Sequence, residues 1–380
     1  MAIFYGRMET YMRNIDNLTF GFIGIGLIGG SVAKALRRVY PGCKIIVYNR
    51  GAKSRVMALN DGTANVALDK VDSTFSECDY IFLCTPVETN IEYLTILKDI
   101  IKDTCIITDV GSVKTNIHQA VIDLNMEDNF IGGHPMAGSE KTSYEHSNDR
   151  LLENAYYPVT PTLCVASKYV EEYKKIISDI GAIPIEISYE EHDRVVAAIS
   201  HLPHLIASSL VNLVKHNDSK FEYMKTFAAG GFKDITRIAS SSPEMWEQIC
   251  MTNNRNISSI LGLYIDDLKK VQNELDSKDG HAINEMIAES RDYRDNLDDS
   301  TNSIIQKSYS IFCDIIDESG AIATIATILA TNGVSIKNIG IIHNREHEEG
   351  VLKISFYDEA SAKKATEQLN RHRYKVFNRK

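Results

Sequence analysis

Three polar residues that can bind substrate or exchange protons each follow a run of apolar residues. They are Thr85 in CTPVETN, Ser112 in DVGSVK and His134 in GGHPMAGSE. Ligands of open α/β sheets bind at the carboxyl ends of the strands, so we expect these side chains to line one crevice. A histidine there can accept a proton, because its ordinary pKa is near neutrality. His134 is therefore the candidate base, and the alternative is a loop histidine that bonds a local carbonyl group.

A glycine-rich segment nearer the N-terminus points to a dinucleotide. Gly24-x-Gly26-x-x-Gly29 follows the apolar run TFGFIG and opens the helical run SVAKALRRV. The first glycine permits a tight turn, the second lets a pyrophosphate approach, and the third lets the helix pack on the strand. Backbone N–H groups at the helix start, those of Leu27 and Ile28 among them, can bind phosphate oxygens. The alternative is a glycine-rich turn that serves packing alone.

The kind of dinucleotide depends on the residues directly after the second predicted strand, KIIVYN. An acidic residue there binds the ribose hydroxyls and disfavours a 2′-phosphate. This sequence has Asn49 and Arg50 instead. Arg50 can tolerate a 2′-phosphate or stack on the adenine, so both NAD and NADP stay open as cofactors. Thr85 and Pro86, at the end of a later strand, complete the predicted cofactor site.

Composition limits the kinds of partner. The 380 residues carry a formal net charge of −10, which argues against nucleic-acid binding because that needs clustered Lys and Arg. None of the seven cysteines forms a C-x-x-C pair, which favours free thiols in a reducing compartment. The first residues lack the pattern of a secretory signal, and no uninterrupted apolar run approaches the roughly 18 residues of a membrane span. We therefore expect a cytoplasmic protein without a membrane partner.

The elements that must position these residues fall into three predicted domains. Six apolar runs, from TFGFIG to YYPVTP, alternate with helical stretches over residues 18–187 and predict one doubly wound parallel sheet. Residues 188–300 lack strand signals and begin with a serine before acidic residues, which predicts an all-helical domain. The order β-α-β-β-α-β over residues 306–380 predicts a small ferredoxin-like domain. The fold class is therefore α/β, with a Rossmann-type first domain. Residues 1–17 have no predicted role.

Two segments of the helical region carry further polar residues. SHLPH contains His201 and His204 around Pro203, and the spacing of the two histidines would permit a metal ion. No carboxylate or thiol motif accompanies them, so we expect no metal site. In GGFKDITRIASSSPEMW, Arg237 could anchor a carboxylate through two hydrogen bonds. An ion pair with a neighbouring helix is the alternative for Arg237.

Taken together, these motifs resemble those of the prephenate and arogenate dehydrogenases of tyrosine biosynthesis. The resemblance extends from about Thr19 to Phe377 and depends on GFIGIGLIGGSVAKAL, TDVGSVK, FIGGHPMAGSEKTS, ISHLPH and GGFKDITRIASSSPEMW, in that order. It implies a Rossmann domain followed by a helical domain that forms a homodimer. It also implies oxidative decarboxylation of prephenate to 4-hydroxyphenylpyruvate, with reduction of NAD or NADP.

The resemblance implies a role for each matching residue. His134 and Ser112 would bind the ring hydroxyl of the substrate, with His134 as the base that accepts its proton. His204 would help to bind substrate, and Arg237 would bind a substrate carboxylate. Glu140 would take part in an ionic network near the entrance of the pocket.

The C-terminal tail resembles an ACT domain, a module that senses amino acids. In such modules the turn after the first strand and the start of the second strand hold an amino acid between paired domains. The matching positions are Gly320, Ala321, Asn338 and Ile339. Tyrosine, the end product of the pathway, is the expected effector. A tail that only strengthens the dimer is the alternative.

Three other functions stay open at this point. An arogenate dehydrogenase would differ only in whether the side chain of its substrate carries an amino or a keto group, and no residue of the sequence decides this. A β-hydroxyacid dehydrogenase would share the cofactor fold but not GGHPMAGSE and FKDITRI. A silent amino-acid sensor would have no need of Ser112, His134, His204 and Arg237 together.

Overall fold

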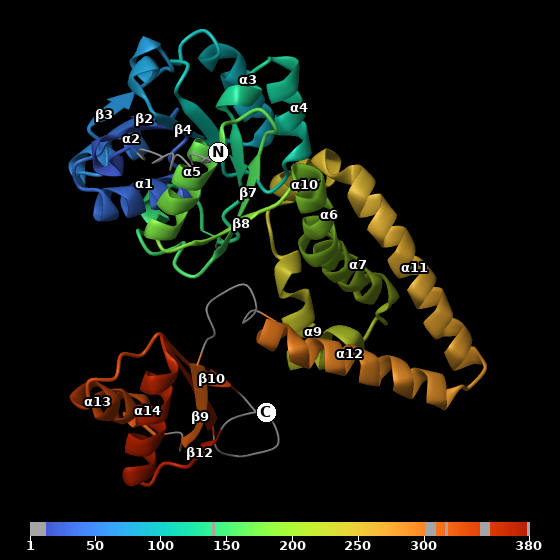
Figure 1. The fold of residues 1–380 in the computed structure, drawn as a ribbon. Helices are drawn as coiled ribbons and strands as arrows, with labels where there is room; N and C mark the ends of the chain where they lie inside the picture. The colour runs from blue at the N-terminus through green and yellow to red at the C-terminus, as the bar shows by residue number, and fades with distance from the viewer. Residues whose placement is uncertain (1–12, 139–140, 301–308, 316–317, 343–349, 378–380) are drawn as a thin grey trace, which may run out of the picture. The chain divides into compact units, whose positions relative to one another are not determined.

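A computed structural model describes residues 13–138, 141–300, 309–315, 318–342 and 350–377. The chain divides into two compact units, residues 1–267 and 268–380. The first unit contains the glycine-rich turn and most of the helical region, and the second contains the C-terminal sheet (Figure 1).

A five-stranded parallel sheet forms the centre of the first unit. Its strands are β1 (Thr19–Ile23), β2 (Lys44–Tyr48), β3 (Val66–Leu68), β4 (Tyr80–Leu83) and β5 (Ile106–Asp109). They lie in the order β3-β2-β1-β4-β5, so the chain moves outward from β1 in both directions. This order is that of a Rossmann domain, and it places the end of β1 where ligands bind.

Helices cover both faces of this sheet. They are α1 (Leu27–Val39), α2 (Ala52–Asn60), α3 (Val87–Leu97), α4 (Thr115–Asp123) and α5 (Ser167–Asp179). Phe20 and Phe22 of β1 point to the core shared with α1 and α5, whereas Ile23 points to the core shared with α3 and α4. Successive strand residues face opposite sides of a sheet, so apolar residues at every position bury both faces. The predicted doubly wound fold is confirmed.

The last strands of this region form a separate sheet, which corrects the prediction of a single parallel sheet. β6 (Ile131–Gly133), β7 (Tyr156–Pro161) and β8 (Ile183–Glu186) lie in the order β6-β7-β8, with β6 and β7 antiparallel. Phe130 makes one isolated bridge to Ile107 of β5, after which the chain pairs with β7. The end of β6, where His134 follows, is therefore not a strand end of the five-stranded sheet.

The helical region follows β8 in the chain. Its helices are α6 (Tyr189–Val196), α7 (Leu202–Asn217), α8 (Tyr223–Phe227), α9 (Gly230–Thr236), α10 (Pro243–Thr252), α11 (Asn254–Asp276) and α12 (Gly280–Ser300). The Ser188 hydroxyl accepts the N–H of Glu191 and caps α6. Pro243 opens α10, where its missing N–H costs nothing. Between α6 and α7 one turn of π-helix, Ala197–His201, precedes Pro203.

The continuous helical stretch Tyr189–Asn217 is long and apolar enough to cross a membrane, judged by length and composition, with a mean hydropathy of 1.4. This differs from the expectation that no segment would qualify. The stretch carries His192, Asp193 and His201, which are buried and hydrogen-bonded to other parts of the first unit. Because these contacts need a folded protein around the start of the stretch, we interpret it as a helix that packs on its own protein rather than as a membrane span.

The C-terminal strands and helices form the predicted ferredoxin-like fold. They are β9 (Tyr309–Ile315), α13 (Ala321–Thr331), β10 (Asn338–Ile342), β11 (Gly350–Phe356), α14 (Glu359–Arg371) and β12 (Val376–Phe377). The sheet order is β10-β11-β9-β12, with antiparallel neighbours throughout. Both helices pack their apolar sides on the sheet, with Leu329 of α13 and Leu369 of α14 fully buried in the core.

Candidate active site

The glycine-rich turn has the shape that a dinucleotide needs. Gly24 has a φ of +90°, which L side chains rarely adopt, and a Cβ there would lie 2.7 Å from Thr85 Cγ2. A Cβ on Gly29 would lie 2.4 Å from the carbonyl oxygen of Gly24. Gly26 differs, because no described atom lies within 4 Å of a Cβ placed on it. Gly24 and Gly29 therefore fix the turn, and Gly26 leaves space for a ligand.

The start of α1 faces that space with unused hydrogen-bond donors. The helix begins at Leu27 and no side chain caps it, so the first N–H groups, including that of Ile28, have no partner within the helix. Such N–H groups and the positive end of the helix dipole bind phosphate oxygens. The residues present thus fit the pyrophosphate of a dinucleotide.

Asn49 and Arg50, after β2, have different parts in this site. The Asn49 side-chain oxygen accepts the N–H of Ile25 at 3.1 Å, which ties the glycine-rich turn to the end of β2. Arg55 binds the carbonyl oxygens of Asn49 and Arg50 at 2.6 and 3.0 Å. The Arg50 residue itself is exposed. Asn49 therefore positions the turn, and Arg50 is the side chain that can reach a ligand.

Thr85 and Ser112 line one cavity of about 400 Å³, together with Pro86 and residues of α10. The hydroxyl and the N–H of Thr85 both donate to the amide oxygen of Asn90, at 2.5 and 3.1 Å. Asn90, fully buried at the start of α3, is a residue that the sequence analysis missed. His134 is not among the residues that line this cavity, and a crevice shared by all three side chains stays a prediction. His134 follows β6, a strand of the other sheet.

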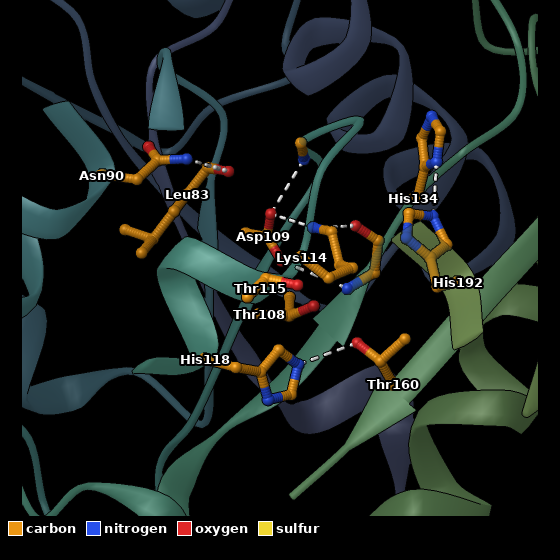
Figure 2. Close-up of polar contacts among 12 residues, drawn as sticks. Leu83, Asn90, Thr108, Asp109, Lys114, Thr115, His118, His134, Thr160 and His192 are labelled. Carbon is orange, nitrogen blue, oxygen red and sulfur yellow. Dashed lines mark hydrogen bonds and ion pairs between the residues drawn. The ribbon is translucent and has the colours of Figure 1, made fainter. Parts of the chain in front are cut away.

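His134 is held through its backbone and through its ring. Its N–H donates to the carbonyl oxygen of Pro158 at 3.0 Å. Its ring nitrogen Nδ1 lies 2.9 Å from Nε2 of His192, on α6 (Figure 2). Burial lowers the pKa of His134 well below its usual value, and the neighbouring His192 and Lys114 lower it further. A neutral imidazole results, which is the form a general base requires.

A fully buried ion pair between Asp109 and Lys114 lies beside this histidine. The Lys114 ammonium also donates to the carbonyl oxygen of Gly133 at 2.8 Å, and Asp109 accepts the N–H of Gly133 at 3.2 Å (Figure 2). The pair therefore fixes the residue that precedes His134. The motif TDVGSVK contains both residues, but sequence analysis selected only Ser112 from it.

His204 and Trp246 form a second part of the site. Their rings stack with centroids 3.5 Å apart, and both line a cavity of about 500 Å³. Among the residues that the structure describes, Nδ1 of His204 and Nε1 of Trp246 are buried and find no hydrogen-bond partner. Buried polar atoms without partners are rare in folded proteins, so a ligand is the natural partner for this pair. Trp246 was not among the sequence candidates.

The remaining candidates lie in other surroundings. Arg237 is exposed at the start of a short turn, Arg237–Ala239, whose Ala239 lines the same cavity as His204. Glu140 lies outside the described residues. His201 bonds to Asn253 at the end of α10 rather than facing His204. In the described part of the chain, no group of three His, Cys, Asp or Glu residues is arranged to hold a metal ion.

The four candidate effector positions lie in the C-terminal sheet region. Gly320, with a φ of +95°, caps α13, and Ala321 is the first residue of that helix. Asn338 and Ile339 begin the edge strand β10. Their part in binding an amino acid stays a prediction.

Comparison with known proteins identifies the family. Residues 32–186 match the family model of the prephenate dehydrogenase nucleotide-binding domain, and residues 188–289 match that of the prephenate dehydrogenase dimerization domain. The prephenate dehydrogenase of Bacillus subtilis (strain 168) is 37% identical over 361 residues, which cover 93% of this chain and 96% of that protein. The chain belongs to the prephenate dehydrogenase family.

Solved structures of prephenate dehydrogenase relatives share this fold. The prephenate dehydrogenase from Aquifex aeolicus, in complex with hydroxyphenyl propionate and NAD+, has a TM-score of 0.70 at 30% identity, with 75% of this chain and 100% of that chain covered. The arogenate dehydrogenase from Synechocystis has a TM-score of 0.68 at 27% identity, with 73% and 99% covered. This member of the prephenate dehydrogenase family is an NAD-dependent oxidoreductase.

Proposed function

We propose that this protein oxidises and decarboxylates prephenate to 4-hydroxyphenylpyruvate with NAD+. The observation that carries the proposal is His134, a half-buried, neutral imidazole held through Nδ1 in a chain of this family. The hydroxyphenyl propionate in the Aquifex aeolicus relative supports it, because that ligand combines a phenol with a carboxylate as the expected product does.

The chemistry asks for one proton acceptor and one anchor for the acid. Prephenate has a hydroxyl group and a hydrogen on C4 of its ring, and a carboxylate on the opposite ring carbon. When bound, NAD+ would be the oxidant and would accept the C4 hydrogen as hydride. Nε2 of His134 accepts the hydroxyl proton as the C4–O bond becomes a carbonyl, and Ser112 binds the same oxygen. The electrons of the bond to the departing carbon dioxide then complete the aromatic ring, and the oxygen on C4 takes up a proton to become the phenol of the product.

The second cavity is the proposed place of the substrate's side chain. The stacked rings of His204 and Trp246 offer an apolar wall and two unused nitrogen atoms. Arg237, on the turn that contributes Ala239 to this cavity, can bind a carboxylate through two parallel hydrogen bonds. Prephenate has two carboxylates, and binding one of them would give Arg237 a function in the reaction. An ion pair with a neighbouring helix would give it none.

The proposal is tested by initial rates of NAD+ and NADP+ reduction, with prephenate and with arogenate as substrates. We expect reduction of NAD+ with prephenate and a smaller rate with arogenate. General-base assistance contributes ~10²–10⁴-fold, so His134→Asn should lower kcat by that order and leave the KM for prephenate nearly unchanged. Arogenate as the better substrate would move the assignment to the arogenate branch. No reduction with either substrate by folded protein would refute the proposal.

We also propose that the protein is a homodimer formed by its helical region. Most of the large apolar side chains that the structure leaves exposed lie on α7–α12, including Leu213, Phe227, Leu263 and Ile287. Monomeric proteins rarely leave so many large apolar side chains exposed on consecutive helices. The match to a dimerization domain supports the same conclusion. Light scattering on the purified protein tests it, and a monomer at micromolar concentration would contradict it.

Tyrosine is the proposed effector of the C-terminal domain. The ferredoxin-like fold with an exposed edge strand, β10, supports an ACT-type module that pairs with a second copy. We expect tyrosine to inhibit prephenate oxidation in the full chain and not in a chain that ends at Gln306. Inhibition that survives the truncation would place tyrosine in the active site.

The proposed location is the cytoplasm, since all seven cysteines are free thiols.

A further inference from the structure

The residues His192 and Asp193 of α6 are buried, polar and without a function in the mechanism above. His192 is 1% exposed and Asp193 is 0% exposed. Burying a histidine and a carboxylate is costly unless each is hydrogen-bonded. Their partners therefore indicate what the two residues do.

Asp193 is bound to the start of α4. Its two carboxylate oxygens accept the N–H groups of Lys114 and Thr115, each at 2.8 Å. Burial alone would raise the pKa of Asp193, but hydrogen bonds from His192 and from these N–H groups outweigh it and lower the pKa. The positive end of the α4 dipole favours the same charged form. Asp193 is therefore an ionised carboxylate, which can only accept hydrogen bonds.

An ionised Asp193 determines the direction of the next hydrogen bonds in the chain. Nδ1 of His192 lies 2.8 Å from the Asp193 carboxylate, so Nδ1 must carry the proton and donate it. In a neutral ring the other nitrogen, Nε2, is then an acceptor. Nε2 of His192 lies 2.9 Å from Nδ1 of His134, so His134 must donate from Nδ1 (Figure 2). Nε2 of His134 is left with a free electron pair.

We propose that His192 and Asp193 are positioning residues that hold His134 in the Nδ1–H tautomer, with Nε2 ready to accept the substrate proton. The inference rests on the proposed role of His134 as the base. The proton that His134 accepts stays on Nε2, and the bond to His192 stabilises the imidazolium that forms. The other charged and titratable neighbours of His134 are Lys114 and His201, and both favour the neutral ring.

The backbone next to His134, the proposed base, is fixed by the start of α4 as well. Lys114 donates its N–H to Asp193 and its ammonium to the carbonyl oxygen of Gly133. One residue therefore connects the carboxylate that sets the tautomer with the peptide that carries His134. His192 has no such link to the backbone of His134, so its substitution tests the tautomer separately from the position of the loop.

Two substitutions of His192 separate an acceptor role from a general loss of packing. His192→Leu removes the acceptor, whereas the amide oxygen of His192→Gln lies near the place of Nε2 and can accept the same hydrogen bond. In a Ser-His-Asp triad, a change that imposes the wrong tautomer costs ~10⁴-fold in kcat. Leucine imposes no tautomer, so we expect a smaller loss, ~10–10²-fold in kcat, with the KM for prephenate within about threefold. Glutamine should restore kcat to within about fivefold of the unmodified protein.

His118→Leu is the matched control. His118 is also a buried histidine of the first unit, but its described interactions are a hydrogen bond to Thr160 and ring contacts with Tyr189 and Phe130, not with His134. It should lose stability to a similar extent and keep kcat within about threefold, since general-base assistance is unaffected. Thermal unfolding of every variant shows whether it is folded at the assay temperature.

A direct measurement of the tautomer does not depend on turnover. Ring nitrogen-15 spectra of histidine-labelled protein, with His134 assigned from His134→Asn, should show Nδ1 protonated and Nε2 unprotonated at neutral pH. In His192→Leu, protonated Nε2 should gain population. An Nε2–H tautomer in the unmodified protein would overturn the inference, as would a folded His192→Leu variant with unchanged kcat, or a glutamine variant as impaired as leucine. Failure of prephenate oxidation alone would leave the spectra unchanged and would refute only the proposed function.

Discussion

The three glycines of the cofactor turn should respond differently to the same added methyl group. In Gly26→Ala the new Cβ meets no described atom within 4 Å, so the fold should be unaffected. In Gly29→Ala the new Cβ would lie 2.4 Å from the Gly24 carbonyl oxygen and 2.8 Å from Cys84 Cβ, so α1 must move away from the sheet. One substitution should therefore change ligand binding, and the other should change stability.

The magnitudes depend on what each methyl group displaces. At position 26 it occupies the approach of the pyrophosphate, where a lost hydrogen bond to a charged group costs ~1.5–3 kcal/mol. The Kd for NAD+ should therefore rise roughly 10- to 150-fold. At position 29 overpacking costs ~1–3 kcal/mol, which lowers Tm by roughly 2–12 °C for a domain of this size.

Calorimetric titration of NAD+ and thermal unfolding of the free protein measure the two effects separately. Gly280→Ala, at the start of α12 and also without a described atom within 4 Å of its Cβ, is the control that should change neither. Equal losses of Tm in Gly26→Ala and Gly29→Ala would refute the assignment of packing to one glycine and ligand approach to the other. Unchanged NAD+ binding by Gly26→Ala would place the pyrophosphate elsewhere.

Three further predictions concern other parts of the first unit. Lys114→Met leaves Asp109 buried without its partner and should lower the free energy of unfolding in urea by ~3–5 kcal/mol, whereas Lys44→Met, which breaks an exposed pair with Glu77, should cost less than ~1 kcal/mol. Arg50→Glu should reduce any activity with NADP+ and preserve that with NAD+ in the rate assay; equal losses with both would contradict a role at the 2′-position. Burial holds the pKa of His118 at about 3 and that of His201 at about 4, so the unfolded chain takes up protons near pH 6.5 that the folded chain does not. The free energy of unfolding should thus fall by ~2 kcal/mol per histidine between pH 7 and pH 5. In His118→Gln this decrease should be smaller by the ~2 kcal/mol that His118 contributes.

The parts of the fold that depend on local chemistry could be predicted from the sequence. The Gly24 turn requires a positive φ, Ser188 caps α6, and Pro243 opens α10, each for reasons contained in a few neighbouring residues. The separate sheet of β6, β7 and β8 could not be predicted, because an apolar run does not indicate which other strand it pairs with. FIGGHP is equally compatible with a parallel strand of the main sheet and with an antiparallel strand beside β7.

The same distinction applies to the site. His134 and Ser112 were found because their types and positions after strands suggest chemistry. Lys114 was missed because a lysine in a loop is ordinarily exposed, and only the tertiary structure shows it fully buried on Asp109. His192 and Asp193 were missed because acidic residues after a helix-capping serine already have a local explanation. Their role in positioning His134 depends on the packing of α6 against the end of β6. This packing brings together His192 and His134, which are 58 residues apart in the chain.

The two groups proposed to bind the substrate hydroxyl are held by the same two buried carboxylates. Ser112 lies in the loop between β5 and α4, where Asp109 accepts the N–H of Gly111 at 2.9 Å and Asp193 accepts the N–H of Lys114. Asp109 also binds the peptide before His134, and Asp193 binds its ring through His192. A displacement of either carboxylate therefore moves the serine and the histidine together. Since Asp193 belongs to α6, the helical region sets the geometry of the base as well as contributing His204 and Arg237, and substitutions in α6 should change kcat without touching the substrate.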